Sequence, residues 1–156
     1  MTSQFLGADA PINVLLVEDS ASDALLTKEA LKDCKITCTL NVVNDGAEAI
    51  AYLRHEERYH NTIHPDIILL DLYLPKKSGF EVLSEIKKDA KLKHIPVIVL
   101  TTSKERSDIV KAYDHRANCY IVKPAEFDVL LKIMRTIEDF WFSVVKLPGD
   151  NADNEA

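Results

Sequence analysis

Five polar residues of this sequence directly follow short apolar runs. Two acids, Glu18 and Asp19, come after the first run, and a third acid, Asp71, closes a later one. Thr101 and Lys123 end two further runs. The carboxyl ends of parallel strands meet at one edge of an open α/β sheet, and ligands bind at that edge. If the runs are such strands, this edge holds three carboxylates, one hydroxyl and one ammonium group.

This set of groups suits phosphoryl transfer. Crowded carboxylates raise each other's pKa unless a cation lies among them. Mg²⁺ prefers oxygen ligands and keeps places for water and phosphate oxygens. With the metal and Lys123 neutralising charge, the carboxylate of Asp71 can act as the nucleophile that receives a phosphoryl group.

Each residue alone also has an ordinary explanation. Asp71 could be a solubilising acid, Lys123 a surface lysine, and Thr101 a cap for the next helix. Glu18 and Asp19 could complement a helix dipole. Their joint occurrence at the ends of four predicted strands argues against coincidence.

The apolar runs and the segments between them predict a regular alternation of strands and helices. A continuous apolar run such as 67–70 is typical of a strand buried on both faces. The sequence therefore predicts a three-layer (βα)5 α/β fold, a doubly wound, five-stranded parallel sheet with helices on both faces. The predicted strands are 12–17, 38–43, 67–70, 95–100 and 119–122, and the predicted helices are 24–33, 47–53, 78–88, 109–113 and a last one from about 126.

Length and charge indicate the domain organisation and exclude some classes of binding partner. The 156 residues predict one domain over 12–147, with a flexible lead-in at 1–11, an acidic tail at 148–156 and no additional output domain. The net charge of -6 argues against nucleic-acid binding. The sequence shows no membrane span or secretion signal, and its three cysteines match no metal or redox spacing. We therefore expect a cytoplasmic protein.

Four motifs, in order and spacing, carry a family resemblance over roughly residues 12–140. The chain resembles the receiver domains of bacterial response regulators, the flavodoxin-like family of the chemotaxis switch protein. The motifs are 17–19, 69–72 followed by Pro75 and Gly79, 96–101, and 120–124.

The resemblance implies a site for phosphorylation. Asp71 would accept a phosphoryl group from a sensor histidine kinase. Asp19 and Asp71 would bind Mg²⁺, with Mn²⁺ as an alternative ion, the backbone carbonyl of Tyr73 would be a third ligand, and Glu18 would act through water. Thr101 and Lys123 would bind the phosphoryl group.

The resemblance also implies a switch. The amide of Thr102 would follow the phosphoryl group with Thr101, and Tyr120 would turn inward as Thr101 moves. This would change the surface made by the helix near 109–113, the strand 119–122 and the last helix. The Lys123–Pro124 bond is a candidate for the cis form, which the family has at this position.

Two positions near the site differ from the commonest family sequences. They are Tyr73, two residues after Asp71, and Ser103, two residues after Thr101. Their side chains could screen or position the attacking water, so we expect Tyr73→Asn to change the autodephosphorylation rate.

The last predicted helix carries an apolar face wider than packing on one sheet requires. A long helix that covers more core would explain it, but we favour a homodimer anchored by this face. The predicted interface residues are Phe127, Leu130, Ile137, Phe140, Trp141, Phe142 and Leu147.

Three further features resemble the small regulators paired with bacterial and cyanobacterial phytochromes. They are the long connection 54–64, the run 100–103, and the segment 138–142 leading to Leu147 and Pro148. This resemblance implies a red/far-red light-sensing histidine kinase as the phosphodonor.

Two other readings compete. One alternative is a phosphatase with a nucleophilic Asp. Such enzymes usually carry a second Asp two residues on as the general acid, and Tyr73 occupies that place, which argues against this class. A pseudo-receiver, a dimerising binding module without phosphorylation, would not need all of the acidic, Thr and Lys positions. The phosphoacceptor switch is therefore the leading hypothesis.

Overall fold

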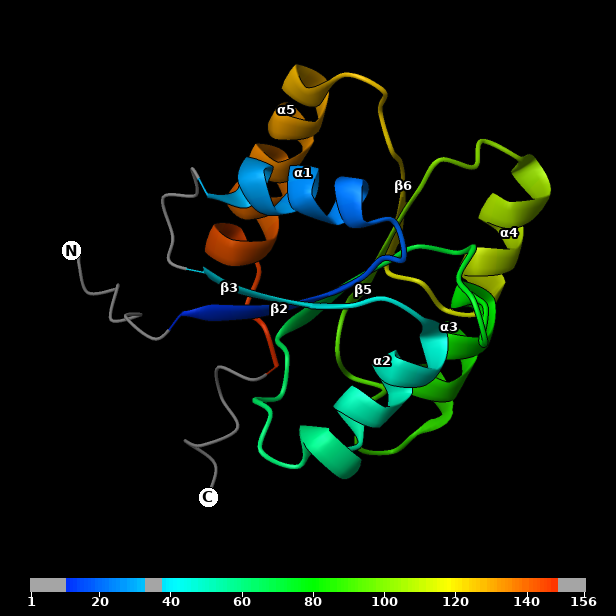
Figure 1. Ribbon diagram of the computed structural model, residues 1–156. Coiled ribbons are helices and arrows are strands. Elements are labelled where there is room, and N and C mark those ends of the chain that lie inside the picture. Colours follow the sequence, from blue (N-terminus) through cyan, green and yellow to red (C-terminus); the bar gives the residue numbers. More distant parts are fainter. Residues whose placement is uncertain (1–10, 33–37, 149–156) are drawn as a thin grey trace.

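A five-stranded parallel sheet forms the middle layer of the protein (Figure 1). The computed structural model describes residues 11–32 and 38–148, so the predicted lead-in and acidic tail lie almost wholly outside the described residues. The strand order is β3-β2-β4-β5-β6, with every neighbouring pair parallel. The strands are β2 (Ile12–Val17), β3 (Cys38–Val43), β4 (Ile67–Leu70), β5 (Val97–Thr101) and β6 (Cys119–Val122).

Helices cover both faces of this sheet, and Figure 1 shows α1 and α5 on one side with α2, α3 and α4 on the other. The predicted three-layer (βα)5 fold is confirmed. The helices are α1 (Ala21–Leu31), α2 (Gly46–Leu53), α3 (Gly79–Lys88), α4 (Arg106–Asp114) and α5 (Phe127–Ile137), with a short 3₁₀ turn η1 (Glu57–Tyr59) before β4.

The central strands are buried on both faces because their side chains alternate between two apolar clusters. In β4, Ile68 and Leu70 pack with α2 and α3, whereas Ile67 and Leu69 pack with α1 and α5. This explains why β4 reads as a continuous apolar run rather than an alternating one. It also fixes the strand rigidly, so the residue that follows it is well placed.

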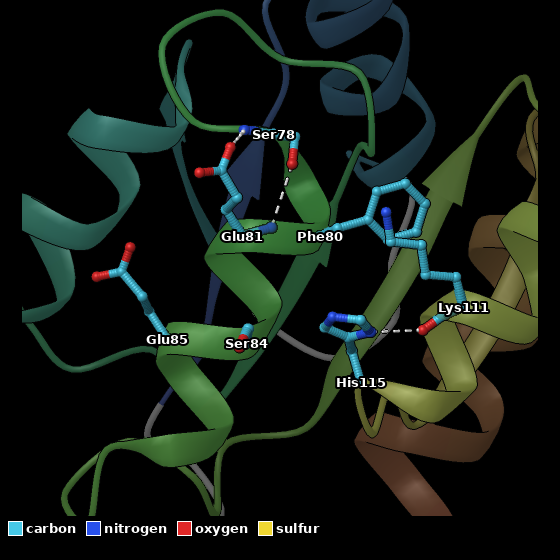
Figure 2. Close-up of a pocket in the computed structure, with 7 residues that line it drawn as sticks. All are labelled: Ser78, Phe80, Glu81, Ser84, Glu85, Lys111 and His115. Atoms are coloured by element: carbon cyan, nitrogen blue, oxygen red, sulfur yellow. Dashed lines mark hydrogen bonds between the residues drawn. The ribbon is translucent and has the colours of Figure 1, made fainter.

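Local signals define the starts of the helices next to the sheet edge. Ser20 caps α1 by accepting a hydrogen bond from the Asp23 amide. Ser78 and Glu81 form a reciprocal capping box at α3, which Figure 2 shows. Gly79 lies so close to the preceding turn that a Cβ there would be 2.2 Å from the Asp71 carbonyl oxygen. The turn after Asp71 therefore requires glycine at this position.

The C-terminal helix differs from its predicted form. It continues past Ile137 as a π-helical segment, η2 (Glu138–Val144), with a bond from the Val145 amide to the Phe140 carbonyl at 2.9 Å. The wider turn advances the buried face by one residue, so Phe142 rather than Trp141 enters the core after Ile137.

The expectation of a cis Lys123–Pro124 bond is wrong in this structure. The residues that the structure describes contain no cis peptide bond, so this bond is trans. The trans form is the lower-energy state of an X–Pro bond by about 0.5–1 kcal/mol in the absence of tertiary forces that select cis. No described helix is long and apolar enough to cross a membrane.

Candidate functional site

The predicted site residues come together at the carboxyl edge of the sheet. Glu18 and Asp19 follow β2, Asp71 follows β4, Thr101 ends β5, and Lys123 follows β6. These four strands are neighbours in the sheet. Carboxylate oxygens of the three acids lie within 4.8 Å of one another.

Lys123 is a buried cation at the centre of this edge. Its Nζ lies 2.5 Å from Glu18 Oε1, 3.0 Å from Asp23 Oδ2 and 3.7 Å from Asp71 Oδ2. Burial by itself lowers the pKa of Lys123, but the hydrogen bonds to Glu18 and Asp23 outweigh burial and raise it above its ordinary value. Lys123 therefore stays charged, and the surface-lysine explanation does not hold.

Glu18 is the buried acid of the group, with 3% of its surface exposed. Burial raises the pKa of its carboxyl, while Lys123 opposes this and the charge of Asp71 adds to it. Glu18 Oε2 also accepts a hydrogen bond from the Ser20 amide at 3.2 Å. Glu18 therefore holds the lysine beside Asp71 and joins it to the start of α1.

Asp71 is fixed at one oxygen and open at the other. Its backbone amide donates to the Val17 carbonyl at 3.1 Å, and the Leu72 amide donates to Asp71 Oδ1 at 2.7 Å. Its Oδ2 faces Lys123. One carboxylate oxygen is thus presented next to a cation, as a nucleophilic oxygen must be.

Thr101 carries an unusual hydroxyl. The residue is fully buried, and among the described residues its Oγ1 is the buried side-chain oxygen without a hydrogen-bond partner. A buried unpaired hydroxyl costs roughly 1–3 kcal/mol and calls for an explanation. Its backbone is tied to the site, since the Lys123 amide donates to the Thr101 carbonyl at 2.6 Å.

Three further predicted residues surround the mouth of the site. Tyr73 is 58% exposed, and its hydroxyl donates to Asp108 Oδ2. Thr102 is exposed at the end of β5. Tyr120 is half-buried and donates from its hydroxyl to the Ser103 carbonyl at 2.9 Å.

The acidic group fits a hard divalent cation. Glu18, Asp19 and Asp71 offer carboxylate oxygens from two adjacent strands, the donor type that Mg²⁺ and Mn²⁺ prefer. Asp19 is exposed, so the group opens to solvent on one side. Such an ion would bring positive charge to a place where, among the described residues, Lys123 is the cation beside Glu18 and Asp71.

A hollow in the described protein lies away from this site. It has a volume of about 350 Å³ and lies between α3 and α4 (Figure 2). The ammonium of Lys111 lies 4.3 Å from the centre of the Phe80 ring, and His115 lies beside it. A smaller hollow of about 320 Å³ adjoins the acids, with Glu18, Asp19 and Leu25 in its lining.

The predicted dimer residues lie away from this site, and they divide into two sets. Leu130, Ile137, Phe142 and Leu147 are buried within the chain itself. Phe127 and Phe140 are exposed, and Trp141 is partly buried with its ring edge-on to Phe140. The π-helical turn explains this division, because it moves Phe142 inward.

The structure also brings in two acids that the sequence analysis did not assign to the site. Asp23 reaches Lys123 from the first turn of α1, and Asp108 receives Tyr73 from the first turn of α4. Acids in the first turn of a helix ordinarily complement its dipole, so their residue type alone does not assign them to the site. The position of α1 directly after Glu18 and Asp19 was the one available signal for Asp23.

A doubly wound sheet with three acids, a buried lysine and a buried hydroxyl at its carboxyl edge defines a receiver-type signalling domain. The sequence model of the family described as response regulator receiver domain matches residues 14–135. The chain belongs to this family, whose members work as signalling switches, and phosphorylation and Mg²⁺ binding are typical of them.

Several relatives are similar over nearly their full length. Response regulator Rcp1 of Synechocystis sp. is 45% identical over 91% of this chain and 97% of its own. The probable methanogenesis regulatory protein FilR2 of Methanothrix harundinacea is 39% identical, with 92% of each chain covered.

Solved structures agree with the fold. The phosphorylated cyanobacterial phytochrome response regulator RcpA is 50% identical with a TM-score of 0.86, covering 89% of this chain and 99% of its own. The Mn²⁺-bound form of Rcp1 is 46% identical with a TM-score of 0.84, covering 88% of this chain and 99% of its own. A divalent metal thus binds in a similar protein.

Proposed function

We propose that this protein is a phosphoacceptor switch in which Asp71 takes a phosphoryl group from a histidine kinase with the help of Mg²⁺. The observation that carries this proposal is the buried, unpartnered hydroxyl of Thr101 beside the acids and Lys123. A phosphoryl oxygen would supply the acceptor that this hydroxyl lacks. The unpaired group is then a feature of the resting state alone.

The transfer itself follows from the positions of the chain's own groups. The free oxygen of Asp71 attacks phosphorus, the P–N bond of a phosphohistidine breaks, and its imidazole leaves. Lys123, now shared with Glu18 and Asp23, lies 3.7 Å from Asp71 and can pair with the new negative charge. Asp19, Asp71 and the Tyr73 carbonyl would hold Mg²⁺, with Glu18 acting through water, and the ion would supply positive charge next to the transferring group.

Phosphorylation of Asp71 would then affect Thr101 at the end of β5 and, through it, the surface of α4, β6 and α5. A phosphoryl group adds about -1.5 to -2 charge and strong acceptor oxygens, which draw the Thr101 hydroxyl and the Thr102 amide. Movement of Thr101 frees space for Tyr120, and the surface of α4, β6 and α5 changes with it. Val110 and Tyr113 of α4 are exposed on that surface.

The proposed phosphodonor is a phytochrome-type histidine kinase. The similar protein RcpA is described as a cyanobacterial phytochrome response regulator, and bacteriophytochrome response regulators are among the other similar solved structures. On this chain, α1 starts at the site and exposes Leu25 and Leu26, 57% and 41% respectively. An apolar helix face beside the phosphoacceptor is a suitable contact for the helix that carries a phosphohistidine.

We also propose that the protein is cytoplasmic and forms a homodimer through the exposed aromatic residues of the C-terminal segment. Phe127, Phe140 and Trp141 are the predicted interface residues that remain accessible. Exposed aromatic residues of this kind serve as anchors in protein interfaces.

The test is the intact mass of the protein after incubation with acetyl phosphate and Mg²⁺. We expect one phosphoryl adduct on the wild type and none on Asp71→Asn or after chelation of the metal. Asp66→Asn, which changes an acid at the opposite end of β4, is the matched control and should keep the adduct. A wild-type protein without an adduct from acetyl phosphate or a kinase would contradict the proposal and favour a binding module.

A further inference from the structure

One carboxylate oxygen joins three segments around the mouth of the site. Asp108 Oδ2 accepts hydrogen bonds from the Tyr73 hydroxyl and from Ser103 Oγ, the latter at 2.6 Å. Tyr73 lies in the loop between β4 and α3, Ser103 in the loop between β5 and α4, and Asp108 in the first turn of α4. We call these three residues the latch.

The latch continues to the residues that are predicted to switch. The Ser103 carbonyl accepts the hydroxyl of Tyr120 at 2.9 Å, and its Oγ accepts the Glu105 amide at 3.2 Å. Ser103 is two residues from Thr101. Its bonds therefore hold the loop that must move if the Thr101 hydroxyl is to reach a new partner.

The position of the latch in the sheet is also relevant. β4 and β5 are neighbours with Leu70 opposite Val99, so Asp71 and Thr101 end adjacent strands. Tyr73 and Ser103 each lie two residues beyond those ends. The bridge between them through Asp108 thus spans the same pair of strands that carries the phosphoacceptor and the unpartnered hydroxyl.

The other attachments of the helix that carries Asp108 lie in its later part, where the Tyr113 hydroxyl accepts a hydrogen bond from the Tyr120 amide at 3.1 Å. Among the described residues of α4, Arg106–Asp114, Ala112 alone is buried. The hollow of about 350 Å³ separates part of α4 from α3, where Lys111 and His115 meet Phe80 (Figure 2). The latch is consequently a main constraint on the first turn of this helix.

We propose that Asp108 is a positioning residue, and that the latch holds the β5–α4 loop in the resting position and must open before Thr101 pairs with a phosphoryl group. This inference rests on the proposed function of Asp71. Opening lets the first turn of α4 move with its acid away from the added negative charge. The closed latch therefore slows phosphorylation.

The experiment measures the rate of Mg²⁺-dependent phosphorylation by acetyl phosphate, followed by intact mass, in Tyr73→Phe, Asp108→Asn and the double variant. Each single variant removes or weakens the same bridge, so each should be phosphorylated about fivefold faster than the wild type. The double variant should be no faster than the faster single variant, because a bridge can be opened only once. Tyr73→Phe changes no charge, so its acceleration cannot come from easier approach of the anionic donor.

Asp114→Asn is the matched control, since it removes the same charge from the last residue of α4 and should keep the wild-type rate. Wild-type or slower rates in Tyr73→Phe, or rate effects that multiply in the double variant, would overturn the latch. A purely structural role predicts a lower Tm with no acceleration, which also overturns it. A wild type that forms no adduct contradicts the function of Asp71 itself, and the latch then falls with it.

Discussion

Thr101 shows how one residue of the site reduces resting stability in favour of a later state. Its hydroxyl is buried without a partner, while the backbone of the same residue is bonded to Lys123. The unpaired hydroxyl destabilises the unphosphorylated protein, and pairing with a phosphoryl oxygen would remove that cost. The Thr101 hydroxyl should therefore lower the free energy of unfolding of the unphosphorylated protein and raise that of the phosphorylated protein.

Replacement of Thr101 by Val tests this dependence, because Val keeps the shape and removes the hydroxyl. We expect the unphosphorylated variant to be more stable than the wild type by about 1 kcal/mol, or roughly 2–4 °C in Tm. The rise in Tm that acetyl phosphate and Mg²⁺ give the wild type should be smaller in the variant. Thermal unfolding with and without the donor measures both.

Thr136→Val is the control for this measurement. Thr136 is an exposed threonine of α5 whose hydroxyl donates to the Lys132 carbonyl at 2.9 Å. Its replacement should leave the response to the donor as in the wild type. A Thr101→Val protein with the full wild-type response would refute the role of the hydroxyl.

At the same scale, the sequence predicts which residues reach the site but not how they pair. Apolar runs fix the strand ends, so Asp71, Thr101 and Lys123 could be assigned to one edge. The ion pair between Glu18 and Lys123 joins residues 105 positions apart, and its geometry depends on the register of the sheet. Asp108 could not be found because nothing in its neighbourhood along the chain points to Tyr73.

Among the elements, α1 joins the site to an exposed apolar surface. It begins directly after Glu18 and Asp19 and is held there by Ser20, while Leu25 and Leu26 face solvent. The two exposed leucines show that this face of α1 does not pack against the rest of the described chain. The adjoining hollow of about 320 Å³ has Leu25 and Asp19 in its lining, so a partner that covers Leu25 also approaches the acids.

We expect Leu25→Asp to slow phosphotransfer from a cognate histidine kinase by about tenfold or more, because it places a charge in a contact that should be apolar. Phosphorylation by acetyl phosphate should stay within about twofold of the wild type, since a small donor needs no docking surface. The measurement compares the two donors on the same protein.

Ile63→Asp is the matched change on a different surface. Ile63 is 61% exposed and precedes β4, at the opposite edge of the sheet from the site. It should affect neither donor. Equal slowing of both donors in Leu25→Asp would point to damage at the site and count against docking on α1.

The C-terminal element shows where sequence periodicity failed. An α-helical period places Ile137 and Trp141 on one wide apolar face of the last helix, as the sequence analysis predicts. The π-helical segment instead places Phe142 at the buried position. Sequence alone could not predict the π-helical segment. Its formation depends on how the aromatic residues pack against the apolar cluster that α1 and α5 share.

On the scale of the whole molecule, the phosphoacceptor edge and the exposed aromatic residues are separate surfaces. The two apolar clusters on either side of the sheet contain most of the buried apolar side chains, including Phe142. Phe140 and Val144 remain 52% and 70% exposed on η2. Large apolar groups left outside both clusters are candidates for contact with a second copy of the chain.

The corresponding prediction concerns Phe140. Sedimentation of the wild type should show a mass that rises with concentration toward that of a dimer. Phe140→Asp should weaken association by about 30-fold or more, the effect expected for an interface anchor. Its unfolding free energy should change by no more than about 0.5 kcal/mol, because the side chain contributes little to the core.

Phe142→Asp separates association from folding in this experiment. Phe142 is buried, so a charge there should destabilise the chain itself, with loss of cooperative unfolding before any question of assembly arises. If Phe140→Asp behaved like Phe142→Asp, the exposed residue would belong to the fold and not to an interface. A wild type that stays monomeric at all concentrations, with and without phosphorylation, would contradict the dimer. A dimer that forms only after phosphorylation would instead show that the change at Asp71 reaches the C-terminal segment through α5, which packs against α1 beside the site.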